Sequence, residues 1–187
     1  MDQKILDNFK NNGIDASFYE TAEELKAQLY KLVPQGSEVM TMTSVTLDAL
    51  GISQEINESG KYNAVRSKLF AGDSEARYRA SVPEYSIGSV HAATEEGQLV
   101  IASATGSQLP AYAYGAKMAI FVIGIQKLVP NLDAAFKRIY DYVFPLENER
   151  ALKAYGSGSG VNKLLVINRE VTPSRIKILF INQKLGF

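Results

Sequence analysis

The sequence contains no cysteine and only one histidine, His91, among its 187 residues. The lack of cysteine excludes disulfide bonds, thiolate zinc sites, iron–sulfur ligation by this chain and a cysteine nucleophile. A histidine-rich metal site is excluded as well, although carboxylates alone can hold Mg²⁺. We therefore predict no metal site, and no pattern in the sequence identifies a cofactor.

An excess of charge of one sign and long apolar runs are also missing. Lys and Arg together number 20, as do Asp and Glu, so broad binding to nucleic acid or an anionic membrane is disfavoured. No apolar run approaches the ~20 residues of a membrane span, and residues 1–13 lack the apolar core of a signal peptide. We expect a cytoplasmic protein, without nucleic-acid or membrane partners, that folds as one domain over residues 1–187.

Strand-like and helix-like segments alternate along the chain. We predict helices over residues 2–12, after the capping box at Thr21, after caps at Ser44, Ser53, Asp73 and Asn131, and after Pro145. We predict strands over residues 14–19, 38–43, 119–123, 163–167 and 176–181. This order predicts a three-layer α/β/α sandwich with a mostly parallel sheet, made mixed by a hairpin near residue 95. Phe136 is expected to pack under the central sheet, and residues 156–160 to form a flexible connection.

The stretch from Ser86 to Ser107 carries the first group of candidate site residues. Two strand-like runs flank the acidic turn Glu95-Glu96-Gly97, which predicts the hairpin. Gly106 permits a tight bend, and Ser107 is a good N-cap for a helix over residues 108–114, so their amides are candidates for holding a small anion. A solvated turn and an ordinary helix cap have the same sequence features, and this interpretation stays open.

A second group lies where strands are expected to end. Ser44 and Thr46 follow one predicted strand, and Lys127 follows the most apolar one, where ligands bind in α/β sheets. We expect one cleft formed by Ser44, Thr46, His91, Glu95, Glu96, Gly106, Ser107 and Lys127. In it a glutamate would act as nucleophile or general base, and His91 would shuttle a proton near neutral pH. The alternative is that the hairpin carries its glutamates to the opposite edge of the sheet.

Six segments, taken in order, carry a family resemblance: FKNNGIDASFYETAEELKAQLYKLVPQGSEV, TSVTLDALGI, SIGSVHAATEEGQLV, VIGIQKLVPNLDAAFKRI, PLENER and RIKILFINQKLGF. The chain resembles the LUD domain family, named for lactate utilisation. The resemblance implies the sugar-phosphate isomerase/CoA-transferase-like fold and iron–sulfur partner proteins in bacterial lactate oxidation. It also implies, by position, site residues at Thr94-Glu95-Glu96-Gly97, Ser44-Val45-Thr46, Lys127, Asn148 and Arg150.

The chain departs from the family pattern at two places. Many relatives carry a cysteine cluster where this chain has residues 154–160, so any metal or redox role of those cysteines is lost. His91 stands where relatives often have Asn, and Met42 and Thr43 stand where they often have Gly. These changes imply a narrowed or retuned pocket.

These observations predict binding or conversion of a small anion, an organic acid, acyl-CoA or sugar phosphate, in bacterial carbon metabolism. By analogy with CoA transferases of this fold, the sharpest version is acyl transfer, in which a glutamate attacks a thioester. The alternative is a non-catalytic subunit or regulator of a lactate-oxidation-type complex, because the cysteine cluster is missing. We also expect a homo-oligomer, with Tyr112, Tyr114 and residues 185–187 as an apolar contact patch.

Overall fold

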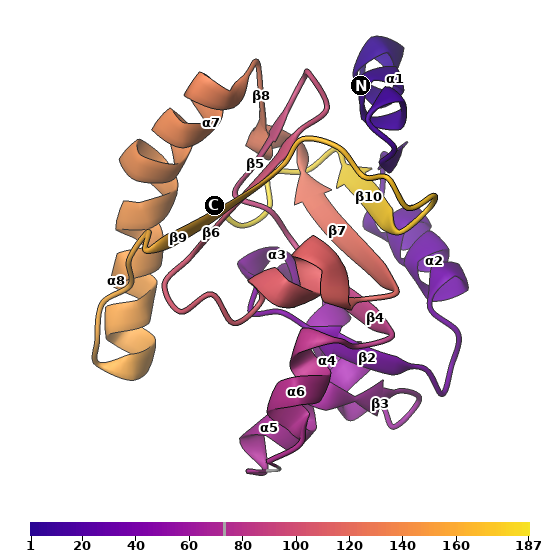
Figure 1. Cartoon of the computed structure of the whole chain (residues 1–187), viewed down its shortest axis with the longest axis vertical. Coiled ribbons are helices and arrows are strands. Elements are labelled where there is room, and N and C mark those ends of the chain that lie inside the picture. Colours follow the sequence, from indigo (N-terminus) through magenta and orange to yellow (C-terminus); the bar gives the residue numbers. More distant parts are fainter. Residues whose placement is uncertain (73) are drawn as a thin grey trace.

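The central layer is a six-stranded sheet in which all neighbouring strands run parallel, in the order β1-β10-β7-β4-β2-β3 (Figure 1). The computed structural model describes residues 1–72 and 74–187. The strands are β1 (Asp15–Tyr19), β2 (Glu38–Thr41), β3 (Asn63–Ala64), β4 (Tyr85–Gly88), β7 (Met118–Gly124) and β10 (Ile176–Ile181). The most apolar run of the sequence forms β7, which lies between β10 and β4 and is buried on both faces.

Helices cover both faces of this sheet. The described helices are α1 (Gln3–Asn11), α2 (Ala22–Leu32), α3 (Val45–Ala49), α4 (Ile52–Glu58), α5 (Val65–Phe70), α6 (Ala76–Ser81), α7 (Leu132–Arg138) and α8 (Phe144–Tyr155), of which α7 packs on the second sheet described below. On one face α2 and α3 bury Leu25 and Leu47 against Ile120 of β7. On the other face α1 buries Phe9 in the same core as Phe121 of β7. This layering confirms the predicted α/β/α sandwich; in the described part of the chain, no helix is both long and apolar enough to cross a membrane.

The predicted hairpin forms, but it belongs to a second sheet. This sheet has the order β8-β5-β6-β9 and consists of β5 (Ala92–Thr94), β6 (Leu99–Ser103), β8 (Leu128–Val129) and β9 (Lys163–Ile167). Both edges of the hairpin are paired there, β5 with β8 and β6 with β9. The antiparallel pairing expected in the main sheet therefore lies outside it. The strands predicted over residues 163–167 and 176–181 form with these bounds, but in different sheets.

A long helical run, from Leu132 to Tyr155, packs on the second sheet (Figure 1). Asn131 caps its start as predicted, its Oδ1 accepting the N–H of Ala134 at 3.0 Å. The helix predicted after Pro145 forms as α8, with the proline in its first turn, although it follows α7 without an intervening loop. A π-helical segment, Ile139–Val143, links α7 to α8 without a break. A π turn is wider than an α turn, so it accommodates the proline ring that would otherwise collide with the preceding turn.

The predicted N-cap residues are confirmed at several helix starts. Thr21 and Glu24 form the predicted capping box, and Ser44 caps α3. The helix expected from Ser53 begins one residue earlier, at Ile52, after Gly51 in the left-handed conformation. The predicted cap at Asp73 lies outside the described residues.

Candidate functional site

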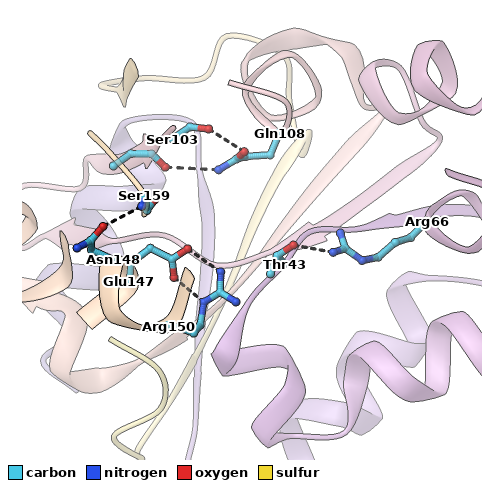
Figure 2. A network of polar contacts seen from close by, with 9 residues as sticks. Thr43, Arg66, Ser103, Gln108, Glu147, Asn148, Arg150 and Ser159 are labelled. Atoms are coloured by element: carbon cyan, nitrogen blue, oxygen red, sulfur yellow. Dashed lines mark hydrogen bonds and ion pairs between the residues drawn. The ribbon is translucent and has the colours of Figure 1, made fainter. Parts of the chain in front are cut away.

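A cavity of about 430 Å³ lies between the main sheet and the α7–α8 layer. Its walls come from the start of α3, the loop before β5, the end of β6, the loop after β7, the inner side of α8 and the chain near Gly186. Figure 2 shows polar side chains from several of these elements converging on the same region. The volume is that of a site for a small metabolite.

Lys127 lies at the wall of this cavity with its side chain almost fully buried. Its Nζ donates hydrogen bonds to Thr46 Oγ1 at 3.1 Å, Ser89 Oγ at 3.1 Å and the Val90 carbonyl oxygen at 3.2 Å. All three acceptors are uncharged, and among the described residues no carboxylate lies within ion-pair distance of Nζ. Burial, with a smaller effect from the Arg138 charge, lowers the pKa of Lys127 to about 7.

His91 lines the same cavity, and its ring is held in one protonation state. The Nδ1 atom accepts the backbone N–H of Ala102 at 3.0 Å, so the ring proton of the neutral form lies on Nε2. Burial, Lys127 and Arg138 lower the pKa of His91 to about 3. The predicted proton shuttle near neutral pH is therefore wrong. His91 instead offers Nε2–H as a neutral hydrogen-bond donor.

Arg150 and Glu147 line the cavity from α8. The guanidinium makes a two-bond pair with the carboxylate, Nε to Oε2 at 2.7 Å and Nη2 to Oε1 at 2.7 Å (Figure 2). The hydrogen bonding of Arg150 to the Glu147 carboxylate is the main reason why the pKa of Arg150 is raised. Asn148 does not line the cavity; its Oδ1 accepts the N–H of Ser159 at 2.9 Å and so holds the loop that does.

Ser44 and Thr46 both line the cavity, and both hydroxyls already have partners. Ser44 Oγ caps α3 by accepting the N–H of Leu47. Thr46 Oγ1 accepts from Lys127 and donates to the Leu185 carbonyl oxygen at 3.1 Å. The segment near Gly186 is thereby held over the Lys127 amine.

A family model for the LUD domain matches residues 3–181, which is nearly the whole chain. The chain belongs to the LUD domain family. A solved structure with the same fold is the crystal structure of a DUF162 family protein from Deinococcus radiodurans, with a TM-score of 0.61 and 11% identity over 96% of this chain and 95% of that one. The likeness to that protein extends to the fold alone. No curated protein matches this LUD-domain chain.

The acidic turn of this LUD domain does not reach the cavity. The side chains of Glu95 and Glu96 are exposed, and their carbonyl oxygens accept hydrogen bonds from Asn8 and Asn12 of α1. Gly97 packs against the backbone of Asn8. Because β5 runs from His91 at the cavity toward this turn, its length of about 10 Å separates the glutamates from the site. The expected single cleft is therefore wrong for Glu95 and Glu96, and the opposite-end alternative describes the structure.

The Gly106-Ser107 pair does not cap the helix that follows it. Gly106 makes the predicted tight bend with a φ of 86°, but its N–H donates to Ser103 Oγ at 2.8 Å. The N–H of Ser107 donates to Thr105 Oγ1 at 3.3 Å. The helix predicted over residues 108–114 forms over residues 109–115, with a π-helical segment at Ala111–Gly115 and without a side-chain cap. Both amides are already bonded, so the predicted anion site on them is wrong; Ser107 lines the cavity and Gly106 does not.

Two parts of the cavity wall were missed by sequence reasoning. The Gly-Ser run at residues 157–160 was interpreted as a mere connection, yet all four residues line the cavity. A Cβ on Gly158 would lie 2.5 Å from Asn148 Oδ1, so glycine is needed for this close approach. Glu147 was also missed, although its place three residues before Arg150 on a helix signals a side-chain pair.

Proposed function

We propose that this LUD-domain protein binds a small organic acid in the cavity, with the ligand's negative charge close to Lys127. The observation that carries this proposal is the buried ammonium group, which contacts three uncharged oxygens and, in the described part of the chain, has no carboxylate partner. Burying an unpaired charge is costly in free energy. A bound carboxylate supplies the missing counter-charge.

The surroundings of Lys127 support an anion rather than a cation. Arg138 does not line the cavity, but its charge lies close enough to lower the pKa of Lys127. His91 adds a neutral Nε2–H donor to the same cavity. The carboxylate of Glu147 is neutralised by Arg150. The balance of free donors and charge therefore favours a negatively charged ligand.

Size selects among the small anions considered. A volume of about 430 Å³ encloses a 2-hydroxy acid, a 2-oxo acid or a small sugar phosphate, whereas an acyl-CoA would extend far outside it. The apolar side chains of Val90, Val143 and Phe144 in the wall suit the carbon skeleton of a short organic acid. The resemblance to lactate-utilisation proteins points to the same class.

Acyl transfer is not part of this proposal. It needs a glutamate that can attack a thioester in the cavity, but Glu95 and Glu96 lie elsewhere and Glu147 is held in a two-bond pair with Arg150. A non-catalytic subunit that binds the acid for a partner protein stays the alternative. Turnover of lactate by the purified chain alone would contradict that alternative.

Titration calorimetry with lactate, pyruvate, ribose 5-phosphate and acetyl-CoA tests the proposal. We expect lactate or pyruvate to bind, and Lys127→Met to weaken that binding by about tenfold to a hundredfold, the cost of one charge-assisted hydrogen bond. The matched control is Lys117→Met, because Lys117 is exposed and pairs with Glu84 at the surface. Equal binding by wild type and Lys127→Met, or no binding of either acid, would overturn the proposal.

A further inference from the structure

We infer that Lys127 forms an imine with the carbonyl carbon of a small 2-oxo acid bound in the cavity. The inference rests on the proposed function, because the acid must first occupy the cavity. It goes further by making the amine of Lys127 a nucleophile and by selecting oxo acids over hydroxy acids. The hydroxy acid can bind but has no carbonyl group to react.

The hydrogen bonds around Lys127 can be made by an uncharged amine as well as by an ammonium group. The Val90 carbonyl can only accept, and Thr46 donates its own proton to Leu185, so both must accept an N–H of Lys127. A neutral amine has two N–H groups for these two acceptors. Its lone pair then faces Ser89, whose hydroxyl can donate a hydrogen bond or rotate away. Since Ser89 lines the cavity, the lone pair lies on the side from which a ligand enters.

The charges around Lys127 favour the uncharged amine. Arg138 approaches from α7 and repels the ammonium form, while His91 stays neutral. The side-chain carboxylates that line the cavity are those of Asp48 of α3 and Glu147 of α8; neither is within ion-pair distance of Nζ, and Glu147 is paired with Arg150. A pKa of about 7 leaves a large share of the amine unprotonated near neutral pH, as Schiff-base lysines require.

The reaction needs no further reagent. The lone pair of Nζ attacks the carbonyl carbon, a C–N bond forms, and the carbonyl electron pair moves to oxygen, which takes up a proton. The nitrogen then loses a proton to give the carbinolamine. The hydroxyl group takes up a second proton, the C–O bond breaks with release of water, and the nitrogen lone pair forms the C=N bond as the nitrogen gives up its second proton. The Nε2–H of His91 is the hydrogen-bond donor in the cavity for the developing oxygen charge, and Ser89 is the hydroxyl beside the nitrogen.

Trapping with sodium borohydride tests the inference on the wild-type chain. With pyruvate, we expect one adduct with the mass of pyruvate minus water plus two hydrogens, mapped by peptide mass spectrometry to Lys127. With lactate, no adduct forms. Lys117→Met keeps the adduct, whereas Lys127→Met loses it.

The pH profile gives a second measurement that needs no variant. Adduct formation at Lys127 should reach half its maximum near pH 7, while modification of exposed lysines increases only at much higher pH. Binding of both acids without an adduct, or an adduct spread over surface lysines, would overturn the imine and leave the proposed function intact. Failure of both acids to bind in calorimetry would overturn the proposed function and the imine together.

Discussion

Burial beside the cavity lowers the pKa of both Lys127 and His91. The ammonium and imidazolium forms would each lose hydration, and each would face the charge of Arg138. Burial is the largest cause of the lowered pKa in both groups, and His91 faces the charge of Lys127 as well. His91 therefore offers a neutral Nε2–H donor, and Lys127 offers an amine whose pKa lies near neutral pH.

The single histidine makes a direct test simple. We predict that the ring of His91 stays neutral between about pH 5 and 8, because its pKa is lowered to about 3. One-histidine NMR titration of the folded protein should show no protonation step in this range, with the proton on Nε2. A midpoint near 6.5 would contradict the hydrogen bond from Ala102.

The lowered pKa of His91 should make the free energy of unfolding depend on pH. Since the unfolded chain binds a proton at His91 below about pH 6.5 and the native chain does not until about pH 3, the free energy of unfolding from this group falls as pH decreases through that window.

Lys127 contributes in the next pH window. Its native pKa of about 7 lies below the ordinary lysine value of 10.5, so the unfolded chain holds more protons between these two pH values. The free energy of unfolding should therefore rise from about pH 7 to 9, by at most about 1.4 kcal/mol per pH unit. Urea unfolding of wild type and Lys127→Met measures this difference, with Lys117→Met as the control. Parallel pH curves for wild type and Lys127→Met would contradict the burial of an unpaired amine.

Among the elements, the helical run from α7 to α8 closes the cavity against the second sheet. The sequence predicted Phe136 under the central sheet, and this was wrong: Phe136 is partly buried and packs with the core of the second sheet. Ile139, at the start of the π-helical segment, is fully buried in that core. Attachment of the helix therefore depends on the second sheet.

Two neighbouring substitutions test this attachment. We expect Ile139→Ala to lower the free energy of unfolding by about 2–5 kcal/mol through the lost apolar contacts and the cavity it leaves. Tyr140→Ala, one residue on and 50% exposed, should change it by about 0.5 kcal/mol or less. Urea unfolding measures both, and equal losses would mean that the helix face is wrongly placed.

At the scale of the whole molecule, the cavity exists only because distant segments meet. Thr46, Lys127 and Leu185 are joined by a chain of two hydrogen bonds, although they come from α3, the loop after β7 and the segment after β10. Gln126 strengthens this junction, with its Nε2 donating to the Leu185 carbonyl oxygen at 2.7 Å. We infer that changes in any one of these segments affect binding in the cavity.

Self-association stays a prediction, but the expected contact patch loses one of its tyrosines. Tyr112, which was expected in the contact patch, is buried against Phe121 and belongs to the core. Tyr114 is 88% exposed and remains available. Sedimentation velocity at micromolar concentration should show a species larger than the monomer, and Tyr114→Ser should reduce it. A monomer alone in wild type would contradict the prediction.

The sequence by itself determined the elements whose signals are local. The caps at Thr21, Ser44 and Asn131 depend on neighbours three residues away, and the apolar run of β7 requires burial wherever it lies. The position of Lys127 after that strand placed it near a site correctly, because parallel strands end at one edge.

Only the tertiary structure decided what depends on distant partners. The hairpin pairs with β8 and β9 in a second sheet, and its turn with Glu95 and Glu96 therefore lies away from the cavity. Ser103 satisfied the Gly106 amide, and Ala102 fixed the tautomer of His91. Hydrogen-bond pairing and loss of water are set by atoms that meet in space, and a linear pattern of residue types does not contain them.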